Sequence, residues 1–118
     1  MGGLASKNFA TADEVRMFDK GQMEVISLGD AIVGRATFQP GWKWSECVKP
    51  IAGTDSCEVA HLGYVVSGRM HVVMNNGTEG EAGPGDLFDI APGHDAWIVG
   101  DEPCVIIDFQ GASNYAKH

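Results

Sequence analysis

The 118-residue sequence predicts an all-β domain built as an antiparallel sandwich or barrel. Short runs rich in Val, Ile, Phe and Tyr are typical of strands, and turn signals rich in Gly, Pro and Asn separate them. Glycine accounts for 16 residues, about twice its usual share of ~7%, as expected for a fold with many tight turns. The length fits one domain over residues 1–118 with a core of its own.

The apolar runs place seven strands along the chain. We expect them at Met23–Leu28, Ala31–Phe38, Glu58–Val66, Met70–Met74, Leu87–Ile90, Ala96–Val99 and Cys104–Phe109. Turn sequences bound them, in chain order at Gly29-Asp30, Gln39-Pro40-Gly41, Ser67-Gly68, Asn75-Asn76-Gly77, Gly83-Pro84-Gly85-Asp86, Ala91-Pro92-Gly93 and Gly100-Asp101-Glu102-Pro103. Asn76-Gly77 predicts a hairpin with a type I′ turn, because this dipeptide accepts positive φ angles.

Two segments lie outside these strands. Residues 1–20 are expected to form an N-terminal extension that covers the barrel or a partner subunit. Within it, Thr11–Glu14 fits a helix capping box that about one helical turn follows. Residues 41–53 are expected to form a loop over one end of the barrel, with Trp42 and Trp44 packed against the sheet.

The strand over residues 58–66 is apolar on both of its alternating faces. Val59 and Val65 lie on one face, and Leu62, Tyr64 and Val66 lie on the other. A sheet with one wet face would alternate between polar and apolar residues. The second face therefore needs a cover, either the N-terminal segment or another subunit, and a homodimer is expected.

Charge and composition exclude several classes of function. Asp and Glu number 16 against 8 Lys and Arg, and the net charge of −8 makes nucleic acid and anionic membranes poor partners. No apolar run approaches the ~18 residues of a membrane span. An odd count of 3 cysteines, without a secretory signal pattern, predicts a cytoplasmic protein. Neither a G-x-S-x-G nucleophile motif nor a P-loop is present.

Residues 55–68 and 85–96 resemble the two signature motifs of the cupin superfamily. The phrase Tyr-Val-Val-Ser-Gly-Arg at 64–69 is typical of the strand and turn that close the first motif. Gly-Asp at 85–86, followed by Ile-Ala-Pro-Gly at 90–93, follows the second motif. The resemblance implies a cupin double-stranded β-helix, the antiparallel jelly-roll barrel, with a small-molecule pocket inside it.

The metal-ligand positions depart from the family pattern. Metal-binding cupins typically use three histidines and one glutamate that point into the barrel. Aligned on Gly68, Asp55 and Cys57 stand at the two histidine positions of the first motif, and His61 stands at the glutamate position. Ala96 stands at the histidine position of the second motif. The family's usual oxygenase or isomerase site therefore does not carry over to this chain.

A replacement site is predicted at Cys57, His61 and His94. Residues two or four apart on a strand share a face, so Cys57 and His61 point the same way. His94 precedes the usual second-motif ligand position by two residues and shares its inward face. Thiolate and imidazole together favour zinc over iron or nickel as the divalent transition metal. Asp55 or Cys47 is a candidate fourth ligand.

The same residues also fit an interpretation without metal. Cys57 would then be a small buried hydrophobe, and His61 would be hydrogen-bonded to the backbone inside the barrel. Three functions stay open from the sequence. They are a small cytoplasmic cupin with a Cys/His metal centre and an unknown reaction, a non-enzymatic module that binds or senses a small molecule, and a structural zinc site with four protein ligands. No catalytic residue is assigned.

Overall fold

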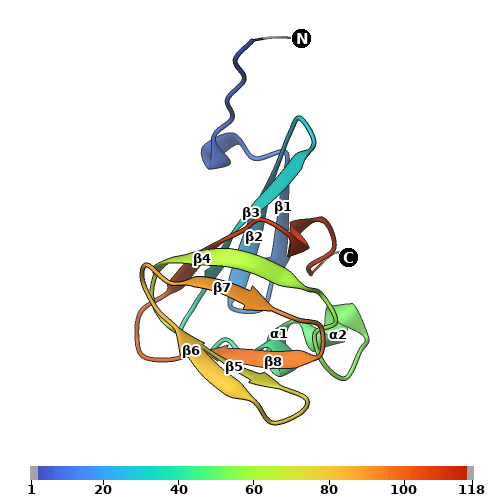
Figure 1. Cartoon of the computed structure of the whole chain (residues 1–118), viewed down its shortest axis with the longest axis vertical. Helices are drawn as coiled ribbons and strands as arrows, with labels where there is room; N and C mark the ends of the chain where they lie inside the picture. Colours follow the sequence, from blue (N-terminus) through green and yellow to red (C-terminus); the bar gives the residue numbers. More distant parts are fainter. Residues whose placement is uncertain (1–2, 117–118) are drawn as a thin grey trace.

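The computed structural model describes residues 3–116, which form two antiparallel sheets (Figure 1). The six-stranded sheet has the order β1 (Glu14–Phe18), β2 (Gly21–Leu28), β3 (Ala31–Phe38), β9 (Cys104–Asp108), β4 (His61–Ser67) and β7 (Leu87–Ile90). The three-stranded sheet has the order β6 (Glu79–Ala82), β5 (Met70–Met74) and β8 (His94–Ile98). Chain neighbours such as β4 and β5 lie in different sheets, as a jelly-roll barrel requires. The predicted all-β antiparallel class is confirmed.

Helical structure is confined to short pieces. Two 3-10 helices, η1 (Phe9–Thr11) and η2 (Gly111–Ser113), lie outside the sheets, and two single-turn helices follow β3, α1 (Trp44–Cys47) and α2 (Lys49–Ala52). The segment predicted as a loop over the barrel end therefore contains α1 and α2, which lie close to β8 in Figure 1. Among the residues that the structure describes, none of the helices has the length and apolar character needed to cross a membrane.

The N-terminal capping box predicted at Thr11–Glu14 is wrong. Asn8 caps the short helix η1 instead, because its side chain accepts the backbone N–H of Ala10. The Asp13 carboxylate accepts the backbone N–H of Ser27 at 2.8 Å and so joins the chain to β2. Residues 14–18 then pair with β2 as an edge strand, because strand pairing satisfies their backbone groups where an isolated helical turn could not.

The predicted hairpin between β5 and β6 is present, but its turn is not type I′. The Gly77 N–H donates to the Met74 carbonyl at 2.9 Å, which places Asn75 and Asn76 at the centre of the turn. Gly77 follows with φ +91°, whereas neither asparagine has a positive φ. This is the three-residue hairpin loop with a left-handed glycine at its end. The acidic strand β6 escaped prediction because its sequence, Glu-Gly-Glu-Ala, has no apolar alternation.

The core lies between the two sheets. Its buried side chains come from strands of both sheets and from the segment that contains α1, and include Met23, Ala36, Phe38, Trp42, Trp44, Val65, Met70, Ala96, Ile98 and Ile106. Each large apolar side chain buried in this way contributes about 1.5–3 kcal/mol to folding. Trp42 and Trp44 are each 2% exposed, which agrees with the expectation that both pack against the sheet.

The outer face of β4 remains uncovered in the single chain. Leu62, Tyr64 and Val66 are 39%, 41% and 49% exposed, so the N-terminal segment does not cover them. Tyr64 pairs with Leu87 of β7 on one side and with Ile107 of β9 on the other. The outward face of the sheet therefore carries a continuous apolar row at this end.

Gly68, in the turn between β4 and β5, cannot carry a side chain without distortion. Its φ is +78°, and an added Cβ would lie 2.4 Å from the Pro103 carbonyl oxygen and 2.5 Å from Cys104 Cα. We expect Gly68→Ala to lower the free energy of unfolding by about 3 kcal/mol or more, because backbone strain and overpacking add. Urea denaturation measures this loss. Gly77→Ala is the matched control, because that site is also left-handed but has nothing within 4 Å; it should lose only about 1–2 kcal/mol. Equal losses in the two variants would contradict the steric argument.

Candidate metal centre

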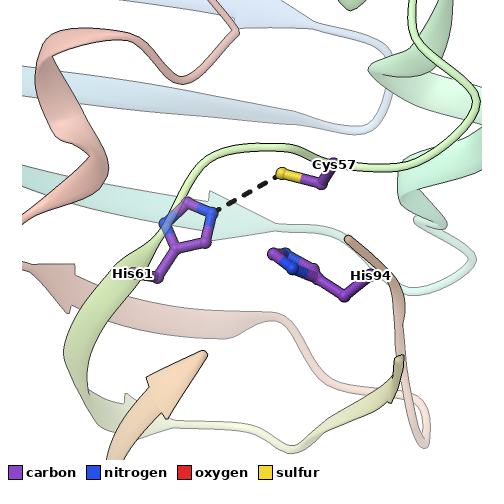
Figure 2. Close-up of side chains that lie close together, drawn as sticks. All are labelled: Cys57, His61 and His94. Carbon is purple, nitrogen blue, oxygen red and sulfur yellow. Dashed lines mark hydrogen bonds between the residues drawn. The ribbon is translucent and has the colours of Figure 1, made fainter. Parts of the chain in front are cut away.

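The side chains of Cys57, His61 and His94 converge inside the barrel (Figure 2). Cys57 Sγ lies 3.7 Å from His61 Nε2, and the ligand atoms of all three residues lie within 4.8 Å of one another. The ring centroids of the two histidines are 5.5 Å apart. All three residues are buried. The structure thus brings together the three residues that the sequence singled out.

Two strands and a short backbone bridge position these side chains. His61 begins β4 and shares its inward face with Gly63 and Val65. His94 begins β8 in the same way, with an alternating buried pattern along the strand. Cys57 lies outside the strands, in an irregular stretch held to β8 by a bridge to His94. In that bridge the Cys57 N–H donates to the His94 carbonyl, and the Gly93 N–H donates to the Cys57 carbonyl, each at 2.7 Å.

Hydrogen bonds at Nδ1 orient both imidazole rings. His94 Nδ1 lies 2.8 Å from the Ala91 carbonyl, which can only accept, so Nδ1 carries the proton. Burial lowers the pKa of His94 and favours its neutral form. His61 Nδ1 lies 2.6 Å from Asp108 Oδ2 and donates to that carboxylate. Histidines that bind metals are oriented by Nδ1 hydrogen bonds of both kinds.

Asp108 is a site residue that the sequence analysis missed. It ends β9, is 0% exposed, and accepts backbone N–H groups from Gln110 and Gly111 as well as the His61 proton. Burial opposes its ionisation, but the hydrogen bonds from His61 and from the two backbone N–H groups outweigh burial and lower the pKa of this carboxyl. Strand parity held a signal for it, because Cys104, Ile106 and Asp108 share the buried face of β9.

Neither candidate for a fourth ligand joins the group. The Asp55 carboxylate is exposed and lies 3.8 Å from Lys49 Nζ. Cys47 is buried, but its Sγ lies 3.8 Å from Asp19 Oδ2. Parity placed Asp55 with Cys57 only on the assumption of a continuous strand, and residues 54–60 do not form one. Within residues 3–116, the group of possible ligands therefore consists of Cys57, His61 and His94.

Burial and nearby carboxylates keep the Cys57 thiol in its neutral form. Burial is the main cause of a Cys57 thiol pKa raised to about 11, and nearby carboxylates, Glu58 first among them, add to the rise. Without a cation the thiol therefore keeps its proton at neutral pH. A metal ion that binds here must displace this proton, so its binding tightens as the pH rises.

The barrel interior beside the histidines is nearly filled. A cavity of about 30 Å³ remains, lined mainly by apolar side chains. Its walls include Met23, Phe38, Trp42, Trp44, Met70 and Ile106, with His61, His94 and Asp108. A water molecule needs roughly 10–15 Å³ of such space, so the cavity holds a ligand about the size of water. One buried side-chain atom of the described residues, the Trp42 Nε1 nitrogen, has no hydrogen-bond partner.

Comparison with solved structures identifies the fold. No protein-family model and no curated protein sequence matches the chain. A Bacillus subtilis oxalate decarboxylase variant superposes with a TM-score of 0.65 at 16% identity, over 96% of this chain and 31% of that one. A Lactobacillus farciminis oxalate decarboxylase in complex with formate gives 0.61 at 15% identity, over 94% and 35%. A Klebsiella pneumoniae protein with a double-stranded beta-helix domain gives 0.55 at 20% identity, over 82% and 81%.

These similarities establish a fold of the cupin type, a double-stranded β-helix, and confirm the resemblance seen in the two sequence motifs. The chain spans about one third of the length of the two oxalate decarboxylases. Inside this cupin barrel, the chain carries a buried Cys/His/His group with the composition of a metal site.

Proposed function

We propose that this cupin-fold protein binds one divalent transition metal through Cys57, His61 and His94, and uses it to bind or transform a small molecule. The observation that carries the proposal is the orientation of the donor atoms. A hydrogen bond occupies Nδ1 in both histidines, His61 Nε2 lies 3.7 Å from the Cys57 sulfur, and one ligand atom from each of the three residues lies within 4.8 Å of the others. A hydrogen bond between Cys57 and His61 alone would not require a ligand atom of His94 to lie within the same 4.8 Å.

The donor set favours zinc. One thiolate and two imidazoles are ligands that zinc accepts, and zinc sites with three protein ligands keep one position for water or substrate. The common non-haem iron site uses two histidines and a carboxylate, and Asp108, the carboxylate that contacts a member of this group, is already engaged by His61 Nδ1. Iron and nickel are therefore less favoured than zinc.

The groups around the proposed metal have separate tasks. A zinc ion, when bound, supplies Lewis acidity and lowers the pKa of a bound water. Asp108 keeps the His61 proton on Nδ1, and the Ala91 carbonyl does the same for His94. The apolar cavity wall limits the water around the centre, which strengthens electrostatic interactions inside it. No side chain is assigned here as a general base.

Elemental analysis of protein purified without added metal or chelator tests the proposal. We expect close to one equivalent of a transition metal per chain, or uptake of one equivalent of zinc by metal-free protein. Protein that takes up no zinc, iron, nickel or copper after the thiols are reduced would overturn the metal centre.

A second candidate is a module that binds a small organic ligand without metal. The unpartnered Trp42 Nε1 supports it, because a buried donor without an acceptor is unfavourable by about 1–3 kcal/mol. An organic ligand with an acceptor atom would satisfy this donor once the cavity that Trp42 lines widens beyond its volume of about 30 Å³. Thermal-shift screening of chelator-treated protein distinguishes the candidates, because ligands of a metal-free module stabilise it equally with and without zinc.

We also propose that the protein forms a homodimer through the outer face of β4, β7 and β9. Tyr64 and Leu87 are exposed apolar neighbours on this face, and a second copy can cover them with the same surface of its own. We expect light scattering to show a dimer that Tyr64→Glu dissociates. Val15→Glu is the control, because Val15 is equally accessible but lies on β1, at the other end of the sheet. A wild-type monomer at every concentration would contradict the proposal.

A cytoplasmic location is part of the same proposal. Cys47, Cys57 and Cys104 are all free and buried in the described part of the chain. Thiols persist in reducing compartments, and the metal centre requires the Cys57 thiol to remain reduced.

A further inference from the structure

The segment that follows β9 folds back against the metal centre. Figure 1 shows it in red, beside β1. Gly111 lies so close to His61 that an added Cβ would be 2.6 Å from Nδ1. Ala112 and Tyr115 are 0% and 4% exposed, so the segment is part of the core although it belongs to neither sheet.

Tyr115 contacts His61 and lines spaces that the other two candidate ligands, Cys57 and His94, also line. Its ring centroid lies 5.3 Å from that of His61, in an edge-on arrangement. The same ring lines the inner cavity together with His61 and His94. Tyr115 also lines an outer groove of about 220 Å³, whose walls include Cys57 and Glu58. Tyr115 therefore stands between the groove and the interior.

One other residue, Trp44, borders both spaces. Trp44 begins α1, is 2% exposed, and is fixed by the backbone hydrogen bonds of that helix and by the contact of α1 with β8. Tyr115 has no such support from regular structure. Because Tyr115 lies in a turn outside the strands and α-helices, displacement of its ring would break no hydrogen bond of a sheet or α-helix.

One buried guanidinium holds the segment of Tyr115 in place. Arg16 of β1 is 5% exposed and donates through Nη1 to the carbonyls of Ala112 and Tyr115, the latter at 2.8 Å. Glu14 pairs with the same guanidinium at 2.8 Å. At the start of the segment, Asp108 accepts the N–H groups of Gln110 and Gly111. The segment is thus tied at its start by Asp108 and near residue 115 by Arg16, which binds the carbonyl of Tyr115 itself.

From these contacts we infer that Tyr115 determines which ligands reach the open position of the metal, and that the outer groove is their approach. The inference rests on the proposed metal centre. With Tyr115 in place, the cavity of about 30 Å³ admits a ligand the size of water. A larger ligand that coordinates through nitrogen or oxygen needs the Tyr115 ring to swing away, which joins the groove to the cavity.

Binding of imidazole to cobalt-loaded protein tests this inference. Cobalt(II) accepts the same ligands as zinc, and its visible spectrum changes when a further ligand coordinates. We expect imidazole to bind the wild type and Tyr115→Phe weakly and with similar affinity, because both keep the aromatic ring at position 115. Tyr115→Ala opens the wall and should bind imidazole about tenfold more tightly or better, a difference of ~1.4 kcal/mol.

A second variant keeps the ring and weakens its attachment. Arg16→Met removes the hydrogen bonds to Ala112 and Tyr115 and retains an apolar side chain of similar length. We expect its affinity for imidazole to lie between those of the wild type and Tyr115→Ala, and it carries the test if Tyr115→Ala does not fold. Cobalt stoichiometry and the far-ultraviolet circular dichroism spectrum must first match the wild type.

The outcomes separate this inference from the proposed function. If no variant and no wild-type protein binds cobalt, the metal centre itself is wrong. If cobalt binds but the wild type takes imidazole as tightly as the folded variants do, the centre stands and the role of Tyr115 is overturned.

Discussion

Cys57→Ser will remove stoichiometric metal and leave the barrel folded. Serine has nearly the same shape as cysteine, but its hydroxyl does not supply the thiolate that zinc binds in such sites. The backbone bridge between Cys57 and His94 uses main-chain atoms and survives the change. Loss of a residue that only hydrogen-bonds to a metal ligand lowers metal affinity by ~10–100-fold. Because Cys57 is itself a proposed ligand, we expect a larger loss of zinc affinity. Competition with a coloured chelator measures the affinity, and His61→Ala should give the same result.

Cys47→Ser is the matched control for this experiment. Cys47 is also buried, but its sulfur faces Asp19 rather than the histidines. It should therefore keep the wild-type affinity for zinc. Full metal content in both Cys57→Ser and His61→Ala would show that the ion is bound elsewhere. Loss of metal in Cys47→Ser would mean that the protein rearranges to add a fourth ligand.

Removal of the Asp108 carboxylate will damage both metal binding and stability. Asp108→Asn keeps the shape but loses the charge that holds the His61 proton on Nδ1, and we expect the zinc affinity to fall by about 10–100-fold. Asp108→Ala leaves the donors of His61, Gln110 and Gly111 without their acceptor in a buried site. It should lower the free energy of unfolding by about 3–5 kcal/mol. Chelator competition and urea denaturation measure the two effects.

Asp86→Asn provides a comparison for the aspartate substitution. The Asp86 carboxylate also accepts a backbone N–H, that of Gly83, but Asp86 is exposed and hydrogen-bonds to none of the three candidate ligands. We expect no change in zinc affinity and less than about 1 kcal/mol of lost stability. Equal zinc affinities in Asp108→Asn and the wild type would show that His61 does not depend on this carboxylate.

Strand parity explains why much of the site could be predicted from the sequence. His94 lies on the buried face of β8, two residues before Ala96, as the alternation required. The same reasoning placed Asp55 beside Cys57, and that placement is wrong. The chain bends at residues 54–56, so the alternation of faces begins only with β4. Cys57 is buried because it is bridged to β8, which local sequence does not reveal.

The residues that support the site were harder to predict because they come from distant parts of the chain. Asp108 meets His61 through the pairing of β9 with β4, a contact across 47 positions in the sequence. Arg16 reaches Tyr115 across 99 positions. A motif reports residues that are close in sequence, whereas these contacts depend on the order of strands in the sheet. Asp108 could have been flagged by its buried parity, but Arg16 and Tyr115 gave no comparable signal.

The bridge between Cys57 and His94 has a consequence for local opening of the molecule. Residues 54–60 belong to neither sheet, and this bridge is what fastens them to β8. A segment with so few backbone hydrogen bonds opens on its own, well before the barrel unfolds. A metal held by Cys57 and His94 ties together the same two residues, so release of the segment would first require loss of the ion. Metal loading would therefore slow amide hydrogen exchange in residues 54–60 far more than in β2 or β3. The exchange rate of this one short loop would then indicate whether the metal centre is occupied.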